Sequence, residues 1–231
     1  MKYKHAHSIT RRDMLAALGL LAAGACSWAP ARASNAQAPM SADEALARLK
    51  QGNDNFVRLM TTTRSQTIAE RTALGSGQSP FATILSCADS RTTPEVVFNQ
   101  GLGDIFVVRV AGNVVTATEQ GSIEYAAAEL KSPLVVVMGH SSCGAVKAGI
   151  GLTEGEKFPG DIEEIAELIE AAARATKGKP GDWVYNTTIA NVQRSIATLQ
   201  GSAVLSEMKS KIGLKLVGAY YKLETGKVTF L

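Results

Sequence analysis

Two short motifs in this chain carry side chains that could bind a metal ion. They are Cys87-Ala88-Asp89-Ser90-Arg91 and His140-Ser141-Ser142-Cys143-Gly144. Cysteine thiolates and histidine imidazoles are ligands that Zn²⁺ prefers in proteins. Three protein ligands, Cys87, His140 and Cys143, would leave one position of a tetrahedral zinc ion open, which is typical of a catalytic site. We therefore predict one Zn²⁺ per subunit, with an open position that a water molecule can occupy.

A carboxylate and a guanidinium group follow the first cysteine closely. Asp89 lies two residues after Cys87, and Arg91 lies two residues further on. An arginine can hold a carboxylate through two parallel hydrogen bonds. Held in this way, Asp89 could accept a hydrogen bond from zinc-bound hydroxide and orient it towards a substrate. Alternatively, Asp89 could become a fourth zinc ligand, which would displace the water and close the site.

Both motifs directly follow predicted strands. Runs of apolar, β-branched and aromatic residues predict strands over 81–86, 105–110, 134–138 and 214–220. The first metal motif begins where the first strand ends, and the second begins just after the third. Ligand sites in open parallel sheets form at the carboxyl ends of strands. Two neighbouring strands could therefore bring Cys87 and His140 into one site.

Helical patterns separate the strands. A capping box at Ser41 and Glu44 predicts a helix over about 42–60, with a polar loop after it. Further helices are expected over 119–130, 143–150, 162–175, 183–200 and 202–211. This alternation predicts an α/β fold with a mostly parallel central sheet and flanking helices. The turn at 224–227 predicts a hairpin that adds residues 228–231 as an antiparallel C-terminal edge strand.

The N-terminus has the features of an export signal. Basic residues precede an apolar run from Met14 to about Ala25, and the sequence 31–33 has the form of a cleavage site. The pair Arg11-Arg12 indicates the twin-arginine route. We therefore expect 1–33 to be a signal peptide, 34–40 a flexible leader and 41–231 the folded domain, located in the periplasm. Cleavage after Ala38 is the alternative.

Removal of the predicted signal changes the charge of the chain. The full sequence has 24 basic and 21 acidic side chains, of which residues 1–33 hold five and one. The mature chain would therefore carry 19 basic and 20 acidic side chains, a net charge of −1. A balance of this kind gives no reason to expect a nucleic-acid partner or, after cleavage, attachment to a membrane.

The paired motifs resemble those of the β-class carbonic anhydrases. The resemblance extends over 103–113, 139–145, 218–221 and 225–228, and in effect over the whole of 41–231. It implies the β-carbonic anhydrase fold and reversible hydration of CO₂ to bicarbonate and a proton. It also implies zinc on Cys87, His140 and Cys143, attack of zinc-bound hydroxide on CO₂, and Asp89 and Arg91 as the catalytic pair.

Further site residues and partners are implied by the same resemblance. Gln100 matches the family position whose amide faces the substrate, and Gly144 would let the backbone pass close to the metal. A homodimer or larger homo-oligomer is implied, with active sites at the subunit interface and the N-terminal helix packed on the partner. The chain departs from the subgroup with a closed, bicarbonate-inhibited site, because Val108 stands where that subgroup has histidine. This departure favours an open site with water on zinc.

Two other functions are compatible with these motifs. A hydrolase of a related cumulene, such as carbonyl sulfide or carbon disulfide, would keep the same fold and metal, because access to the site decides the substrate. A non-catalytic protein that binds zinc and bicarbonate is the second, although the pair Asp89 and Arg91 argues against it. A disulfide between Cys87 and Cys143 would leave His140 without an explanation.

One expectation follows from the number of histidines. His140 is the only histidine after residue 33, and as a metal ligand it cannot carry protons. The usual side chain for proton transfer near neutral pH is therefore missing. We expect proton release to depend on external buffer or on a tyrosine such as Tyr125.

Overall fold

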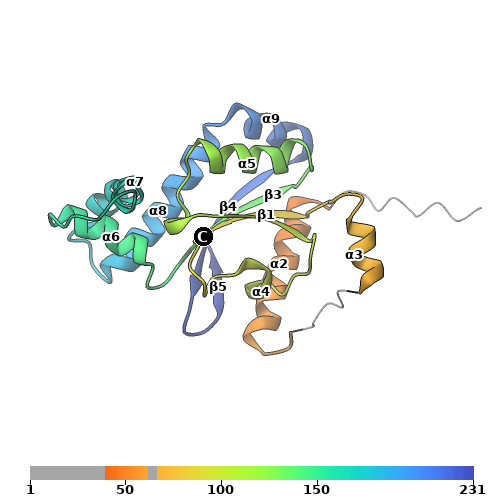
Figure 1. The fold of residues 1–231 in the computed structure, drawn as a ribbon, viewed down its shortest axis with the longest axis horizontal. Helices are drawn as coiled ribbons and strands as arrows, with labels where there is room; N and C mark the ends of the chain where they lie inside the picture. The colour runs from red at the N-terminus through yellow and green to blue at the C-terminus, as the bar shows by residue number, and fades with distance from the viewer. Residues whose placement is uncertain (1–39, 62–66) are drawn as a thin grey trace, which may run out of the picture. The chain divides into compact units, whose positions relative to one another are not determined.

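The computed structural model describes residues 40–61 and 67–231, and its centre is one five-stranded sheet (Figure 1). The strands are β1 (Ala82–Ser86), β2 (Ile105–Arg109), β3 (Leu134–His140), β4 (Lys215–Lys222) and β5 (Lys227–Phe230). Their order is β2-β1-β3-β4-β5; the first four are parallel, and β5 pairs with β4 in the antiparallel direction. The predicted α/β fold with an antiparallel edge strand is confirmed. The predicted signal peptide at 1–33 lies outside the described residues, as does the leader except for Met40.

The helices that surround this sheet are α2 (Ala42–Val57), α3 (Ile68–Leu74), α4 (Pro94–Val97), α5 (Ala117–Ala128), α6 (Gly144–Thr153), α7 (Ile162–Thr176), α8 (Trp183–Gln200) and α9 (Ala203–Ile212), with a short 3₁₀ helix η1 (Ala111–Asn113). All except α3, α4 and η1 follow ranges that the sequence predicts. The capping box that predicts the first helix is present, since Ser41 and Glu44 exchange hydrogen bonds. That helix ends at Val57, three residues earlier than expected.

Alternate residues of the strands face two different sets of helices. Ile84 and Val136 pack into one cluster with Leu49 of α2, whereas Leu85 and Val137 pack into another with residues of α5, α8 and α9. In Figure 1, α2 and α4 accordingly lie on one side of the sheet, and α5 and α9 lie on the other. Every residue of β3 is buried, as expected for a central parallel strand that is covered on both faces. Each fully buried aliphatic side chain contributes about 1.5–3 kcal/mol to folding, so the ends of β1 and β3 rest on a well-stabilised support.

The loop expected after α2 contains a helix that the sequence analysis did not predict. Helix α3 begins after Thr67, whose side chain forms a capping box with Glu70. None of its seven residues is buried, so the apolar periodicity that reveals an amphipathic helix is absent. The expectation of an uninterrupted polar loop was therefore wrong.

Among the described residues, no helix combines the length and the apolar character that crossing a membrane requires.

Candidate metal centre

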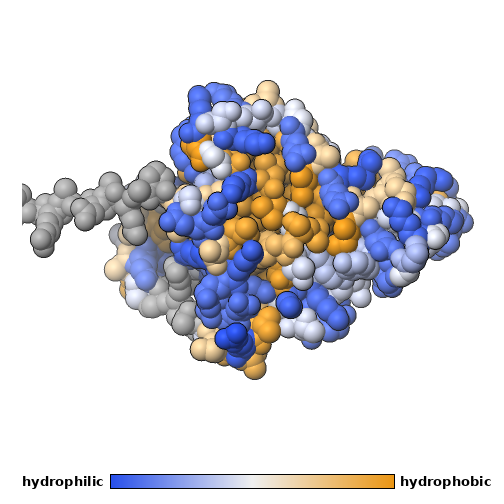
Figure 2. All heavy atoms as spheres, turned by 180° about the vertical axis from the view of Figure 1, so that it is seen from behind, coloured by the Kyte–Doolittle hydropathy of each residue, from blue (hydrophilic) through white to orange (hydrophobic). Residues whose placement is uncertain are grey.

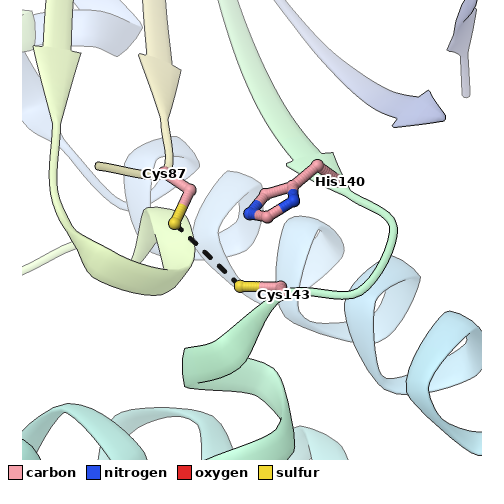
Figure 3. A group of neighbouring side chains, drawn as sticks. All are labelled: Cys87, His140 and Cys143. Carbon is pink, nitrogen blue, oxygen red and sulfur yellow. Dashed lines mark hydrogen bonds between the residues drawn. The ribbon is translucent and has the colours of Figure 1, made fainter. Parts of the chain in front are cut away.

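The ends of two adjacent strands place the two motifs side by side. β1 and β3 pair in parallel, with Ser86 opposite Met138, so their carboxyl ends meet at one edge of the sheet. Cys87 follows β1 directly, and His140 is the last residue of β3. Cys143 is the N-cap of α6, three residues after His140. Figure 3 shows the three side chains turned towards one another.

The distances within this cluster suit one zinc ion. The ligand atoms of Cys87, His140 and Cys143 all lie within 4.8 Å of one another, and the two sulfur atoms are 4.0 Å apart. Two thiolates at about 2.3 Å from a tetrahedral zinc ion would lie about 3.8 Å apart. Both cysteines are free thiols and buried, so the structure does not contain the alternative disulfide.

The surroundings of His140 give a second indication that a metal ion binds at this cluster. His140 is 1% exposed, and its Nδ1 atom lies 2.9 Å from the carbonyl oxygen of Ser141. Its Nε2 atom is buried and has no hydrogen-bond partner within the described parts of the chain. Buried polar atoms are nearly always satisfied, so this nitrogen is an unusual orphan unless it binds a metal. The three side chains therefore fit zinc.

Hydrogen bonds also prepare the first cysteine to act as a thiolate. The contact with Cys143 lowers the pKa of Cys87 against the opposing effect of burial. The neighbouring side chain of His140 and the backbone N–H groups of Gly112 and Asp89 lower this pKa further. These two N–H groups lie 3.3 Å and 3.4 Å from the sulfur. The pKa of Cys143 is raised, because Cys87 takes the first negative charge of the pair and because Cys143 is buried. The pair thus holds one negative charge readily and gains the second when a metal binds.

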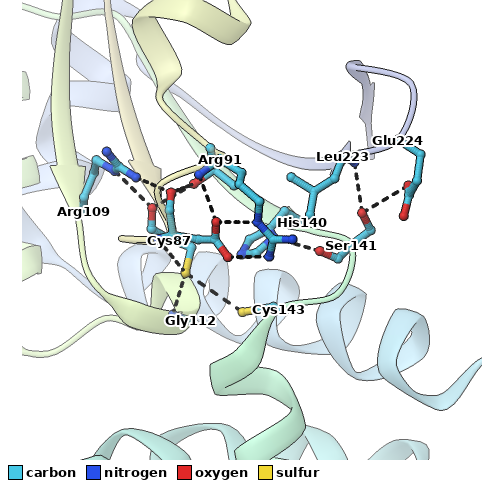
Figure 4. Close-up of polar contacts among 11 residues, drawn as sticks. Cys87, Arg91, Arg109, Gly112, His140, Ser141, Cys143, Leu223 and Glu224 are labelled. Atoms are coloured by element: carbon cyan, nitrogen blue, oxygen red, sulfur yellow. Dashed lines mark hydrogen bonds and ion pairs between the residues drawn. The ribbon is translucent and has the colours of Figure 1, made fainter.

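Asp89 and Arg91 form the expected two-point pair, and Figure 4 shows Arg91 beside Cys87 and His140. Arg91 Nε donates to Asp89 Oδ1 at 2.9 Å, and Arg91 Nη2 donates to Asp89 Oδ2 at 2.7 Å. The hydrogen bonds from Arg91 hold the pKa of the Asp89 carboxyl well below its usual range. Asp89 is therefore engaged with Arg91 here, and the metal-binding cluster consists of the cysteines and the histidine.

The loop that carries Cys87 and Asp89 is fixed by residues that the sequence analysis did not identify. Arg109, at the end of β2, donates to the carbonyl oxygens of Cys87 and Asp89 at 3.1 Å and 2.6 Å. The hydroxyl of Thr92 lies within hydrogen-bonding distance of the same two oxygens, at 3.0 Å and 2.9 Å. The sequence does contain a signal for Arg109. It is a charged residue near the end of the predicted strand 105–110, where ligand sites of parallel sheets form.

The structure places Gln100 and Gly144 without linking either one to a substrate. The side chain of Gln100 donates to the carbonyl of Phe98 at 2.6 Å and accepts a hydrogen bond from Arg48 at 3.1 Å. Gly144 is the first residue of α6, and a Cβ atom there would meet no atom within 4 Å. The expected roles of Gln100 beside the substrate and of Gly144 beside the metal stay predictions.

Comparisons with known proteins agree with this reading of the site. The sequence model of the carbonic anhydrase family matches residues 82–228. A carbonic anhydrase of Mycolicibacterium smegmatis is 41% identical over 189 residues, which are 78% of this chain and 88% of that protein. Carbonic anhydrase 2 of Mycobacterium tuberculosis is 38% identical over 181 residues, covering 78% and 87% of the two chains. Among solved structures, the β-carbonic anhydrase CcaA is 27% identical, with a TM-score of 0.65 over 80% of this chain and 94% of that one.

Proposed function

This chain belongs to the β-class carbonic anhydrase family, and we propose that Asp89 and Arg91 direct the hydration reaction at its zinc site. The chain is a zinc-dependent carbonic anhydrase that converts CO₂ to bicarbonate and a proton, and Cys87, His140 and Cys143 hold one zinc ion per subunit. The observation that carries the proposal is the two-point pair between Asp89 and Arg91, two residues from a metal ligand.

When bound, zinc supplies a Lewis acid that makes a water molecule acidic enough to react near neutral pH. The protein contributes a buried cluster in which two thiolates balance the two positive charges of the ion. Since Cys87 and Cys143 are 5% and 1% exposed, bulk water does not compete for their sulfur atoms. The backbone N–H groups of Gly112 and Asp89 donate hydrogen bonds to the Cys87 sulfur and so fix its position.

The two oxygens of Asp89 have different roles in this proposal. Oδ1 accepts hydrogen bonds from Nε and from the backbone N–H of Arg91, whereas within the described residues Oδ2 accepts one from Nη2 alone. A carboxylate oxygen can accept about two hydrogen bonds, so Oδ2 keeps a lone pair for the reacting water. Because Arg91 lowers the pKa of Asp89, this carboxylate stays ionised and acts only as an acceptor. It thereby orients the water towards CO₂.

An Asp89→Asn variant tests this role, because it keeps the shape of the side chain and removes its charge. We expect full zinc content and a fall in kcat/KM of about a hundredfold, as for loss of other positioned catalytic groups. Asp43→Asn, at an exposed carboxylate of α2, is the matched control. Asp89→Asn with wild-type kinetics would remove Asp89 from the mechanism.

The two alternative functions are less well supported. The relatives that cover most of this chain are named carbonic anhydrases, which favours CO₂ over carbonyl sulfide or carbon disulfide as the substrate. A protein that only binds zinc and bicarbonate would need no carboxylate held beside the metal ligands. Assays with CO₂ and carbonyl sulfide on the same zinc-loaded sample separate the first alternative from the proposed function.

A homodimer is also part of the proposal, with its interface along the free side of β2. This strand pairs with β1 on one side only, and Phe106 on it contacts Tyr125 of α5 with ring centroids 6.3 Å apart. Tyr125, and Leu102 three residues before the start of β2, are 50% and 54% exposed. Figure 2 shows one face of the protein on which apolar side chains gather near the middle, framed by polar ones. Exposed apolar surface of this kind is typical of contacts between subunits.

Light scattering on size-separated protein tests the dimer. We expect twice the monomer mass for the wild type and a smaller mass for Leu102→Glu, because a charge at a buried interface is unfavourable. Leu168→Glu, at an exposed position of α7, is the control and should keep the wild-type mass. A wild type that is monomeric at micromolar concentration would contradict the proposal.

We further propose export to the periplasm by the twin-arginine route, on the strength of the sequence of 1–33. Substitution of Arg11 and Arg12 by lysine keeps the positive charge and changes the side chains that define the route. In fractionated cells, we expect the wild type in the periplasm at the size of a chain that lacks 1–33. The double lysine variant should stay in the cytoplasm at full length, and its appearance in the periplasm would contradict this route.

A further inference from the structure

The sulfur of Cys87 receives a hydrogen bond from a segment far away in the sequence. The backbone N–H of Gly112, in η1, points to Cys87 Sγ at 3.3 Å (Figure 4). Both residues are buried. A buried N–H group without a hydrogen-bond partner would lower the stability of the fold. The contact with Cys87 Sγ therefore stabilises the loop that contains Gly112 as well as the thiolate.

The position of Gly112 is restricted by its backbone and by its neighbours. Its φ angle is +74°, in the left-handed region that favours glycine. A Cβ atom there would lie 2.6 Å from Ile169 Cδ1 and 3.0 Å from Ala145 Cβ. The loop therefore packs directly against α6 and α7. Packing of this kind fixes where Gly112 lies, but the direction of its peptide groups depends on hydrogen bonds.

Two sets of hydrogen bonds orient these peptide groups. Within η1, the N–H of Asn113, which shares a peptide group with the Gly112 carbonyl, donates to the carbonyl of Val110 at 3.0 Å. Helix α8 supplies side-chain donors from the other side of the loop. Asn191 Nδ2 donates to the carbonyl of Gly112 at 2.7 Å, and Ser195 Oγ donates to the carbonyl of Asn113 at 3.0 Å. The two side chains are four residues apart and so lie on one face of the helix. They are only 2% and 5% exposed. Consecutive carbonyls of η1 are thus held by one buried polar face of α8.

We propose that Asn191 is a positioning residue of the zinc site, acting through Gly112 on Cys87. The amide of Asn191 fixes the Gly112 carbonyl, and the rigid loop then keeps the preceding N–H on the sulfur. Partners of metal ligands commonly change metal affinity in this way, because they orient the ligand and adjust its electron density. The inference rests on the zinc site, but it concerns metal binding and does not depend on the proposed role of Asp89.

Asn191→Leu tests the proposal, since leucine has a similar size and cannot donate. Substituted cobalt(II) reports on the sulfur ligands through the thiolate-to-cobalt absorption band. A thiolate that loses a hydrogen bond transfers an electron to cobalt more easily. We therefore expect the thiolate-to-cobalt band of Asn191→Leu to lie at lower energy than that of the wild type. The zinc dissociation constant, measured against a competing chelator, should rise about tenfold or more.

Thr188→Val is the matched control on the same helix. The hydroxyl of Thr188 is also buried, but it donates to the carbonyl of Val184 within α8 and not to η1. We expect this variant to keep the cobalt band and the zinc affinity of the wild type. A folded Asn191→Leu protein with an unshifted band and unchanged affinity would overturn the proposal, as would equal changes in both variants.

A measurement on the unsubstituted protein decides the case if Asn191→Leu does not fold. With ¹¹³Cd in the site, an N–H···S hydrogen bond transmits a scalar coupling between the amide proton and the metal. We expect this coupling at Gly112 in the wild type and a smaller one in Asn191→Ala. Absence of the Gly112 coupling in the wild type would overturn the proposal. Failure of the wild type to bind cobalt, cadmium or zinc would instead contradict the zinc site itself.

Discussion

Cys87 Sγ and Cys143 Sγ lie 4.0 Å apart, although 56 positions separate the two residues in the sequence. One cysteine follows β1, and the other caps α6 after β3, so the distance is set by the pairing of two parallel strands. No disulfide joins them, and the imidazole of His140 completes the cluster. The arrangement leaves the thiols available to a metal and buried from most other reactants.

Replacement of Cys143 should therefore remove the metal. We expect Cys143→Ser to lose most of its zinc and its CO₂ hydration, because a serine hydroxyl does not replace a thiolate as a zinc ligand. Metal analysis of the purified protein measures the first effect. Ser142→Ala, at the exposed neighbouring position, should keep one zinc ion per subunit. Stoichiometric zinc in Cys143→Ser would argue against the cluster.

Arg91 should be needed for its shape as well as its charge. Lysine cannot form the two parallel hydrogen bonds that Arg91 makes with Asp89. We expect Arg91→Lys to keep its zinc and to lose roughly tenfold to hundredfold in kcat/KM, since a charge-assisted hydrogen bond is worth about 1.5–3 kcal/mol. Arg194→Lys, at an exposed position of α8, is the control. Equal kinetics in the two lysine variants would show that the paired geometry does not matter.

Alanine substitutions at two glycines should distinguish the effect of backbone strain on stability from the effect of overpacking. Gly112 and Gly178 have φ angles of +74° and +76°, but only a Cβ at Gly112 would meet other atoms. We expect Gly178→Ala to lower the free energy of unfolding by about 1–2 kcal/mol, from backbone strain alone. Gly112→Ala should lose a further 1–3 kcal/mol or so from overpacking, and it should also bind zinc more weakly. Chemical denaturation and chelator competition measure the two effects, and equal losses in both variants would contradict this packing.

Proton release should be limited by the buffer. Within the described residues, His140 is the only histidine, and it is committed to the metal. We expect kcat for CO₂ hydration to rise with buffer concentration at fixed pH and ionic strength, whereas kcat/KM should not change. A value of kcat that is independent of the buffer would indicate a proton carrier within the protein.

The zinc ligands could be predicted from the sequence because their signals are local. Each of the two motifs follows a strongly apolar strand, and carboxyl ends of neighbouring parallel strands meet at one edge. The same reasoning placed Asp89 beside Arg91, since two residues of spacing suffice for the pair. The sheet was predictable for a related reason, because its buried central strands are short and rich in apolar and β-branched residues.

The supports of the site could not be predicted in this way. Asn191 reaches Gly112 across 79 positions, and the contact depends on how α8 packs over η1. In the sequence, Asn191 is only a polar residue within a helical pattern. The N–H of Gly112 is a backbone group, so no residue type marks it as a partner of Cys87. Helix α3 was missed because all seven of its residues are exposed, so no buried apolar stripe marks it.

The central claim is zinc-dependent hydration of CO₂ at the Cys87, His140 and Cys143 cluster. Stopped-flow measurement of CO₂ hydration on purified protein of known zinc content tests it most directly, before and after removal of the metal by a chelator. We predict hydration far above the buffer background with one zinc ion per subunit, loss of this activity in the metal-free protein, and recovery when zinc is returned. Protein with full zinc content and no hydration above background would contradict the account.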